Sequence, residues 1–404
     1  MSNFNLNSHL DNVIKKVNIF SRVVGIAVDD RDADATFSKR LQHHWVYVFH
    51  MIWLYSEIAG ELVFLVRILT ERRGLVEFTY VVPCIAECLL GTCKSYFVIK
   101  YAHHVHDIIN TLKKVQTDVE TEEFTEETKN FVNKTVLYLN KLVSFFFGFY
   151  SLLISSFGVG PLTITATKYF KHGVTQLELP FLISYPFNAR DIRIWPFVFL
   201  HQLWAGNMAV MALMCSDLLY YVFCTYIFIQ FHLLHKQLEN LKVSMFLEEG
   251  MSSHFLKLVK RHKEIIRCVE LVEVIYTKST LLNMITSSLL ICLTGFDVMV
   301  IKDLALLLPF LGFLSAGLMQ IYFLCYYGDL IMRSSELISE ALYNSQWYSG
   351  NIRIKKELIL MMMRSQKPCR LTAFGFADVD LETYKKILST SWSYFALLNT
   401  MYQK

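Results

Sequence analysis

The sequence predicts an all-α membrane protein that crosses the bilayer seven times, and three observations carry this prediction. The chain has 404 residues, of which 54% are hydrophobic and only 18% are charged. Its mean hydropathy is +0.36, and the apolar residues are spread along the whole chain, as in proteins with many membrane spans. Apolar segments of about 20 residues, the length that crosses the hydrocarbon core, recur seven times.

The expected spans lie, in chain order, at residues 45–66, 75–98, 141–165, from 194 past 228, 279–299, 304–328 and in the tail 379–404. Pro83, Pro196 and Pro309 fall within or at the start of spans, where neighbouring helices can satisfy a freed carbonyl. We accordingly divide the chain into a cytoplasmic N-terminal segment, a six-helix transmembrane bundle, a cytoplasmic anchor helix with its linker, and a last helix, at residues 1–43, 44–330, 331–378 and 379–404.

The positive charges predict the orientation of the chain. Segments outside the spans alternate between a side that holds 25 Lys and Arg residues and a side that holds 9. Because the basic side is normally cytoplasmic, we expect the N-terminus inside and the C-terminus outside. G-protein-coupled receptors have seven helices in the opposite orientation, so the charge count argues against that class. None of the nine cysteines falls in an expected external loop, and no extracellular disulfide framework is indicated.

The last helix carries an unusual stripe. Residues 387–402 hold no charge, and at helical spacing one side presents two hydroxyls and then bulky apolar groups, from Thr390, Ser393, Leu397, Thr400 and Met401. Water-filled pores are lined in this way, since hydroxyls replace lost ion hydration and apolar side chains gate by dewetting. A Ser/Thr stripe also suits helix–helix packing in lipid. Both interpretations stay open at this point.

Aromatic side chains gather in the expected outer halves of four spans. Small-molecule sites are concave and mostly apolar, and in helix bundles they lie between helices. We therefore predict an outward-facing pocket for a small, mostly apolar ligand, closed over by the 166–193 loop. Ordinary bundle packing or an interfacial aromatic belt would give the same pattern. The predicted ligand-contact residues are Phe78, Tyr80, Phe146, Phe149, Tyr150, His201, Trp204, Met208, Phe310 and Phe313.

Ionisable residues inside the spans are expensive and call for partners. Glu57 and Glu61 share a face of the first helix, Glu87 and Lys94 lie on the second, and Asp217 interrupts the fourth. We expect them to face the bundle and to pair with one another or with water. No catalytic motif and no complete metal-ligand set occurs, so we predict neither an enzyme nor a cofactor or metal. The net charge of +4 is too small to indicate nucleic acid as a partner.

The 331–364 segment has helical apolar periodicity. We predict that Ile338, Ala341, Leu342 and Trp347 form a cytoplasmic packing layer between subunits. Three runs here, RSSELISEALYNSQWY, MMMRSQKPCRLTAFGF and LETYKKILSTSWSYFALLNTMY, strongly resemble the C-terminal signature of insect odorant receptors. The loop sequence ELPFLISYPF, followed by Gln202, resembles the same family.

The resemblance implies a ligand-gated, non-selective cation channel, built as a tetramer around a pore lined by the last helix. It places Leu397 and Met401 at an apolar gate and Thr400 at a polar pore position. Two departures from related proteins refine the expectation. Thr390-Ser391 stand where gustatory receptors carry Gln-Phe, and the connection between the fourth and fifth spans is only some forty residues, far shorter than in the shared co-receptor.

We therefore expect an odour-tuning subunit that binds small volatile ligands. It would assemble with the co-receptor as a heterotetramer in the plasma membrane of olfactory dendrites. A gustatory-type homomeric channel and a metabotropic receptor are the alternatives. A transporter would show saturable flux and lose function when Glu87 or Asp217 is neutralised.

Overall fold

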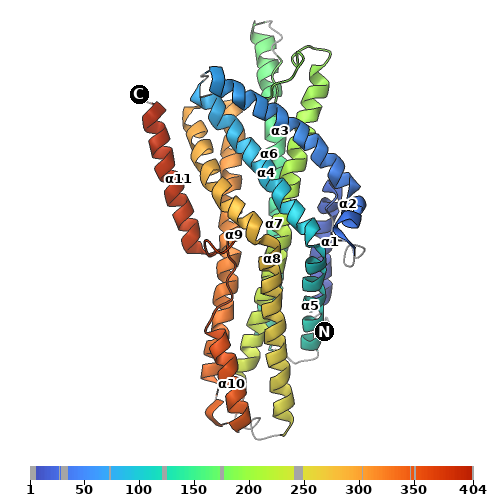
Figure 1. Ribbon diagram of the computed structural model, residues 1–404, viewed down its shortest axis with the longest axis vertical. Coiled ribbons are helices and arrows are strands. Elements are labelled where there is room, and N and C mark those ends of the chain that lie inside the picture. Colours follow the sequence, from blue (N-terminus) through green and yellow to red (C-terminus); the bar gives the residue numbers. More distant parts are fainter. Residues whose placement is uncertain are drawn as a thin grey trace.

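The computed structural model describes residues 6–26, 28, 35–71, 74–120, 125–172, 177–240, 249–302, 304–345, 347–349 and 352–402. This part of the chain is an elongated bundle of helices without a β-strand (Figure 1). The helices are α1 (Leu6–Val24), α2 (Phe37–His43), α3 (Trp45–Glu71), α4 (Leu75–Lys100), α5 (Ala102–Glu120), α6 (Glu126–His172), α7 (Trp195–Glu239), α8 (Glu249–Val300), α9 (Leu304–Asn344), the 3-10 helix η3 (Trp347–Ser349), α10 (Ile352–Ser365) and α11 (Leu381–Tyr402).

Helix α7 is the centre of the bundle, with α1, α3, α4, α6, α8 and α9 packed around it. Its sequence is apolar on every side, as in helices that lie in a protein core or in the hydrocarbon of a membrane. Of its most apolar 18-residue stretch, 94% lies buried inside the chain. The side chains with the largest buried volume include Tyr220, Tyr221, Phe223 and Tyr226 of this helix. The core of the molecule is therefore built along α7.

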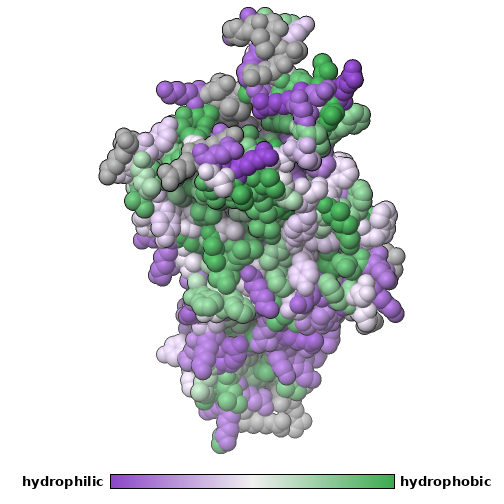
Figure 2. Space-filling model, turned by 45° about the horizontal axis from the view of Figure 1, so that its top comes forward, coloured by the Kyte–Doolittle hydropathy of each residue, from purple (hydrophilic) through white to green (hydrophobic). Residues whose placement is uncertain are grey.

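Five of the helices, α4, α6, α7, α8 and α9, are long and apolar enough to cross a membrane. Helices α3 and α11 occupy two further expected spans but do not reach the same hydropathy, since α3 carries three glutamates and α11 is rich in hydroxyls. Figure 2 shows a hydrophobic band over the body of the molecule, with hydrophilic side chains below it and at the top. The ends of α3, α6 and α11 and the start of α7 lie together at the upper end (Figure 1).

Besides the seven-residue α2, two longer helices lie where no span and no regular structure was predicted. The 99–136 segment, expected as a loop, forms α5 and the first turns of α6. Within α5, Val105, Ile108 and Leu112 recur at helical spacing and are buried. In the N-terminal segment, α1 likewise buries Leu6 and Leu10 and packs against α7. Both are amphipathic helices outside the apolar band, so a search for long apolar runs did not find them.

The lower end of the molecule is formed by the extended ends of α7, α8 and α9 together with α10 (Figure 1). Helix α9 runs unbroken across the boundary predicted at residues 330 and 331. Ile338, Ala341 and Leu342 are fully buried within this chain, so their side chains pack the core of the subunit instead of offering a surface to a neighbour. Trp347, the fourth residue predicted for the intersubunit layer, stays partly exposed.

Helix α11 lies at the edge of the bundle and packs on α8 and α9 (Figure 1). The side chain of Asp380 accepts a hydrogen bond from the backbone N–H of Thr383 at 2.8 Å, which caps the first turn. At this lower end Gly328 of α9 lies directly against the backbone carbonyl of Val379, a contact that leaves no room for a Cβ. Higher up, the Ser391 hydroxyl donates to the Ser288 carbonyl of α8 at 3.1 Å. One narrow seam thus holds the helix.

Candidate ligand-binding site

A small, largely enclosed cavity lies between α4, α6, α7 and α9. Its volume is about 70 Å³. An engineered cavity of about 150 Å³ binds benzene, so we expect the surrounding side chains to move outward when a ligand of that size enters this smaller cavity. The walls are mainly aliphatic and aromatic, and they comprise Cys84, Glu87, Cys88, Tyr150, Leu153, Ile154, Phe157, Phe181, Leu203, Gly206, Asn207, Ala209, Val210, Leu213, Phe313, Ala316, Gly317 and Gln320.

Residues 178–187, which we call the lid segment, cover the cavity at its upper end. Phe181 of the lid segment forms part of the cavity wall and stacks on Phe157 of α6, with ring centroids 5.5 Å apart. The side chain of Gln202 accepts a hydrogen bond from the Phe181 backbone N–H at 2.9 Å and donates to the Tyr185 hydroxyl at 3.2 Å. A single α7 side chain therefore fixes two points of the lid segment.

Other hydrogen bonds tie the lid segment to three more helices. The Tyr80 hydroxyl of α4 donates to the Pro180 carbonyl at 2.7 Å, and the Ser184 backbone N–H donates to the Gly60 carbonyl of α3 at 3.2 Å. The Glu178 carboxylate pairs with Lys168 of α6 at 2.7 Å. Because α3, α4, α6 and α7 all bind this segment, a movement of any of these four helices would displace it.

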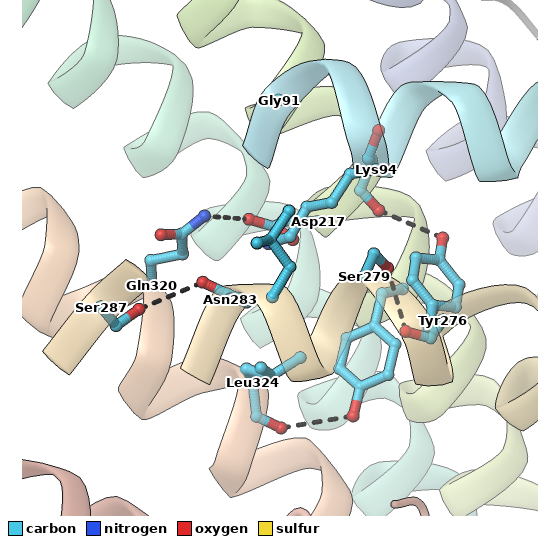
Figure 3. A network of polar contacts seen from close by, with 12 residues as sticks. Gly91, Lys94, Asp217, Tyr276, Ser279, Asn283, Ser287, Gln320 and Leu324 are labelled. Atoms are coloured by element: carbon cyan, nitrogen blue, oxygen red, sulfur yellow. Dashed lines mark hydrogen bonds and ion pairs between the residues drawn. The ribbon is translucent and has the colours of Figure 1, made fainter. Parts of the chain in front are cut away.

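A buried polar network lies beside the cavity (Figure 3). Asp217 of α7 pairs with Lys94 of α4 at 2.6 Å and accepts a hydrogen bond from the Gln320 amide of α9 at 2.9 Å. Lys94 and Asp217 are only 2% and 6% exposed. The ionisable residues of the spans were expected to pair with one another or with water, and the structure pairs Lys94 with Asp217. Gln320 also lines the cavity, so this network joins the cavity wall to three helices.

The structure brings only part of the predicted ligand set to the cavity. Tyr150 and Phe313 line it directly. Phe146 and Phe149 stack or pack edge-on against Tyr150, with centroids 5.9 and 5.7 Å away, and form a second layer behind it. Tyr80, with its hydroxyl on the lid segment, packs edge-on against Phe310, with ring centroids 5.0 Å apart. Six of the ten predicted ligand-contact residues therefore lie in one region of the molecule: Tyr80, Phe146, Phe149, Tyr150, Phe310 and Phe313.

The remaining four predicted residues lie away from the cavity walls. His201 stacks on Trp53 of α3 at 4.9 Å, and the Trp204 indole N–H donates to His50 of the same helix at 3.3 Å. Trp204 also borders an open groove between α6 and α7, which shares Ile154, Leu203 and Asn207 with the cavity. Met208 is buried, and Phe78 is partly buried near the start of α4. A role in ligand contact stays a prediction for all ten residues.

Several lining residues escaped the sequence analysis. Phe157 follows the predicted aromatics of the third span by two turns, and Phe181 belongs to the loop motif that the analysis had quoted for other reasons. Asn207 and Gln320 are polar residues inside apolar helices, which is a signal for a ligand site or a buried network. Attention to isolated polar residues within the spans would have found both of them.

The five residues of the α11 stripe all lie on its exposed side. Thr390, Ser393, Leu397, Thr400 and Met401 are exposed, with Leu397 at 61% and Met401 at 65%. On the opposite side, Ile387 and Ser391 are buried. The stripe thus faces away from the seam with α8, and both interpretations, a pore lining and a helix–helix packing surface, stay predictions. The exposed stripe remains available for a pore or for neighbouring subunits.

A bundle of membrane-length helices around a small, mostly apolar cavity defines a multi-pass helical membrane protein with a candidate small-molecule site. The sequence of residues 74–392 matches the family described as the 7tm odorant receptors, and the chain therefore belongs to the odorant receptor family. The family predicted from the C-terminal motifs is confirmed.

Curated relatives and solved structures agree. Odorant receptor 13a of Drosophila melanogaster is 32% identical over 240 residues, which cover 55% of this chain and 57% of the relative. Odorant receptor 85c of the same species is 25% identical over 391 residues, 95% of this chain and 98% of the relative. The insect olfactory receptor OR5 from Machilis hrabei in complex with eugenol has the same fold, with a TM-score of 0.82, 15% identity and coverage of 98% and 99% of the two chains.

Proposed function

We propose that this chain is the odorant-binding subunit of an odour-gated, non-selective cation channel in the plasma membrane. It would assemble with the shared odorant co-receptor as a heterotetramer, with the N-terminus cytoplasmic and the C-terminus extracellular. The exposed stripe of α11 is the observation that supports this most directly. Lipid can cover exposed apolar side chains in a membrane protein, but on this side of α11 Leu397 and Met401 alternate with exposed hydroxyl groups, and that combination suits the lining of a pore.

The architecture also suggests how a ligand in the cavity reaches α11. Helix α9 contributes Phe313 and Gln320 to the cavity and, further along, Gly328 to the contact with Val379 at the base of α11. A ligand larger than the 70 Å³ cavity favours a state in which the surrounding helices are spread. Displacement of α9 would then move the base of α11 and withdraw Leu397 and Met401 from the pore axis.

Two other functions make different demands on the same fold. A gustatory-type homomeric channel would conduct without a co-receptor. A metabotropic receptor would require the opposite orientation, and its currents would depend on G protein or nucleotide.

Patch-clamp recording distinguishes the three functions. Cells would express this chain alone, the co-receptor alone, or both, and an odorant panel would be applied to excised patches in nucleotide-free solution. We expect odour-evoked unitary currents only when both chains are present. Currents from this chain alone would support the homomeric channel. Responses that occur in whole cells and vanish without nucleotide would refute the ionotropic proposal.

The gate assignment makes a separate prediction. The double variant Leu397→Ser with Met401→Ser should let water into the constriction and raise the basal leak current severalfold, because small hydroxyl groups do not favour dewetting. Trp392→Ser is the matched control, since Trp392 is also exposed but lies on another side of α11. Unchanged leak and unchanged ion permeation in the double variant, measured beside the control, would show that the gate lies elsewhere.

A further inference from the structure

Glu87 sets this cavity apart from a purely apolar odorant pocket. Among the described residues that line the cavity, it is the one carboxyl group. It projects from α4 between Cys84 and Cys88, with Leu153 and Phe157 of α6 among the other walls. A carboxyl group in such surroundings is costly unless a charged or hydrogen-bonding partner satisfies it.

No such partner comes from the described part of the chain. Lys94, the nearest cation on the same helix, is two turns away and holds Asp217 at 2.6 Å. Gln320 lines the cavity too, but its amide N–H₂ group donates to Asp217 at 2.9 Å. No hydrogen bond or ion pair to Glu87 occurs among the described residues. Lys94 and Gln320 thus donate to Asp217, and the other two strong donors of the wall, the Tyr150 hydroxyl and the Asn207 amide, make no hydrogen bond to Glu87 within the described residues, so its carboxyl is left for whatever enters.

The remaining walls define the rest of the ligand. Phe157, Phe181 and Phe313 offer aromatic surfaces, and Leu153, Leu203 and Val210 offer aliphatic ones. A compact hydrocarbon or ring fits these walls, while a terminal cation would satisfy the single carboxylate. Charge-assisted hydrogen bonds of this kind are about twice as strong as neutral ones.

We propose that the cavity is tuned to small, mostly apolar amines whose ammonium group pairs with Glu87. This inference rests on the proposed function, because it names the ligand class for the same pocket. An alcohol or phenol could donate a neutral hydrogen bond to the same carboxyl, and the experiment below separates that case from an amine.

The test compares three probes of nearly equal shape: benzylamine, benzyl alcohol and ethylbenzene. The full chain, purified with its co-receptor in lipid nanodiscs, is heated with increasing concentrations of each probe. The concentration dependence of the Tm shift gives the affinity without any need for channel opening. We expect benzylamine to bind at least about tenfold more tightly than ethylbenzene, because a hydrogen bond to a charged group contributes about 10- to 100-fold.

Glu87→Gln should remove this preference and leave ethylbenzene binding within about twofold of wild type. Glu87→Met serves as a second variant of similar length, in case the amide disturbs folding. Glu77→Gln is the matched control, since Glu77 lies on the same helix, outside the cavity, and should keep the preference.

The results that would overturn the inference are distinct. Equal affinity for all three probes in the wild-type protein, or a preference that survives in Glu87→Gln, excludes Glu87 as the determinant. Benzyl alcohol bound as tightly as benzylamine excludes an amine specificity. Loss of odour-evoked currents with intact, selective Tm shifts would instead count against the proposed channel function and leave the ligand class standing.

Discussion

Lys94 and Asp217 place two opposite charges deep inside the bundle, at 2.6 Å from each other. Replacing Lys94→Met should destabilise the folded chain by about 3–5 kcal/mol, because it leaves the Asp217 carboxylate buried without its cation. The double variant Lys94→Met with Asp217→Leu should recover much of that loss, since no uncompensated charge remains. Thermal unfolding of the purified protein, followed by fluorescence-detected size exclusion, measures both changes.

The exposed pair Lys386–Glu382 provides the control, at 2.8 Å and on the surface of α11. Lys386→Met should leave the unfolding temperature unchanged, because solvent screens exposed pairs. Equal effects of Lys94→Met and Lys386→Met would contradict the burial of the inner pair.

Gln202 makes a second residue-scale prediction. Gln202→Leu should loosen the lid segment, because the Phe181 N–H and the Tyr185 hydroxyl lose their partner. Loss of a buried hydrogen bond costs about 1–3 kcal/mol, so current decay after odorant removal should accelerate about 5- to 100-fold. Gln230→Leu is the control, because it removes a buried hydrogen bond to Arg261 at the other end of α7 and should leave the current decay unchanged. Identical decay in Gln202→Leu and wild type would mean that the lid segment does not control ligand exit.

At the scale of elements, the contact between α9 and the base of α11 is the tightest one in the proposed pathway. Gly328→Ala would push a methyl group into the Val379 carbonyl, so we expect either poor surface expression or a displaced α11 with altered gating. Gly148→Ala in α6 is the control, because its new methyl meets nothing within 4 Å. It should stabilise its helix by about 0.5–1 kcal/mol. Surface biotinylation and single-channel open probability report the two effects, and equal behaviour of both variants would exclude a hinge at Gly328.

The accuracy with which each helix could be predicted depended on its amino-acid composition. The apolar helices α4, α7 and α9 begin within a residue or two of their predicted starts, because a long apolar run has few other solutions in a membrane protein. Helices α1 and α5 are polar on one side and escaped a search for apolar runs. The sequence predicted an apolar cavity between helices but only some of the residues that line it. Tyr150 and His201 are both aromatic residues in the outer halves of spans, and only the packing of the helices shows that Tyr150 faces the cavity and His201 faces α3.

At the scale of the whole molecule, the orientation can be tested with two glycosylation sequons at opposite ends. Asn188 is exposed beside the lid segment, and Arg190→Thr would create an acceptor sequon there. The natural sequon at Asn133 lies near the lower end of α6. With the C-terminus extracellular, Arg190→Thr should add one glycan, while Asn133 stays unmodified; Arg190→Ala controls for the lost charge.

A gel shift after endoglycosidase treatment reads out each variant. Modification of the wild-type chain at Asn133, with no additional glycan in Arg190→Thr, would reverse the orientation and remove the channel geometry built on it.

The small volume of the resting cavity has a consequence for how sensitivity and selectivity are divided. Every ligand binds only after the helices have spread, and this spreading costs the same free energy whichever ligand binds. The apparent affinity is the intrinsic affinity multiplied by the fraction of molecules that are already spread. That common term sets a detection threshold shared by all ligands. Substitutions in distant packing layers should therefore raise or lower the response to a whole odour panel together, whereas substitutions in the cavity wall should reorder it.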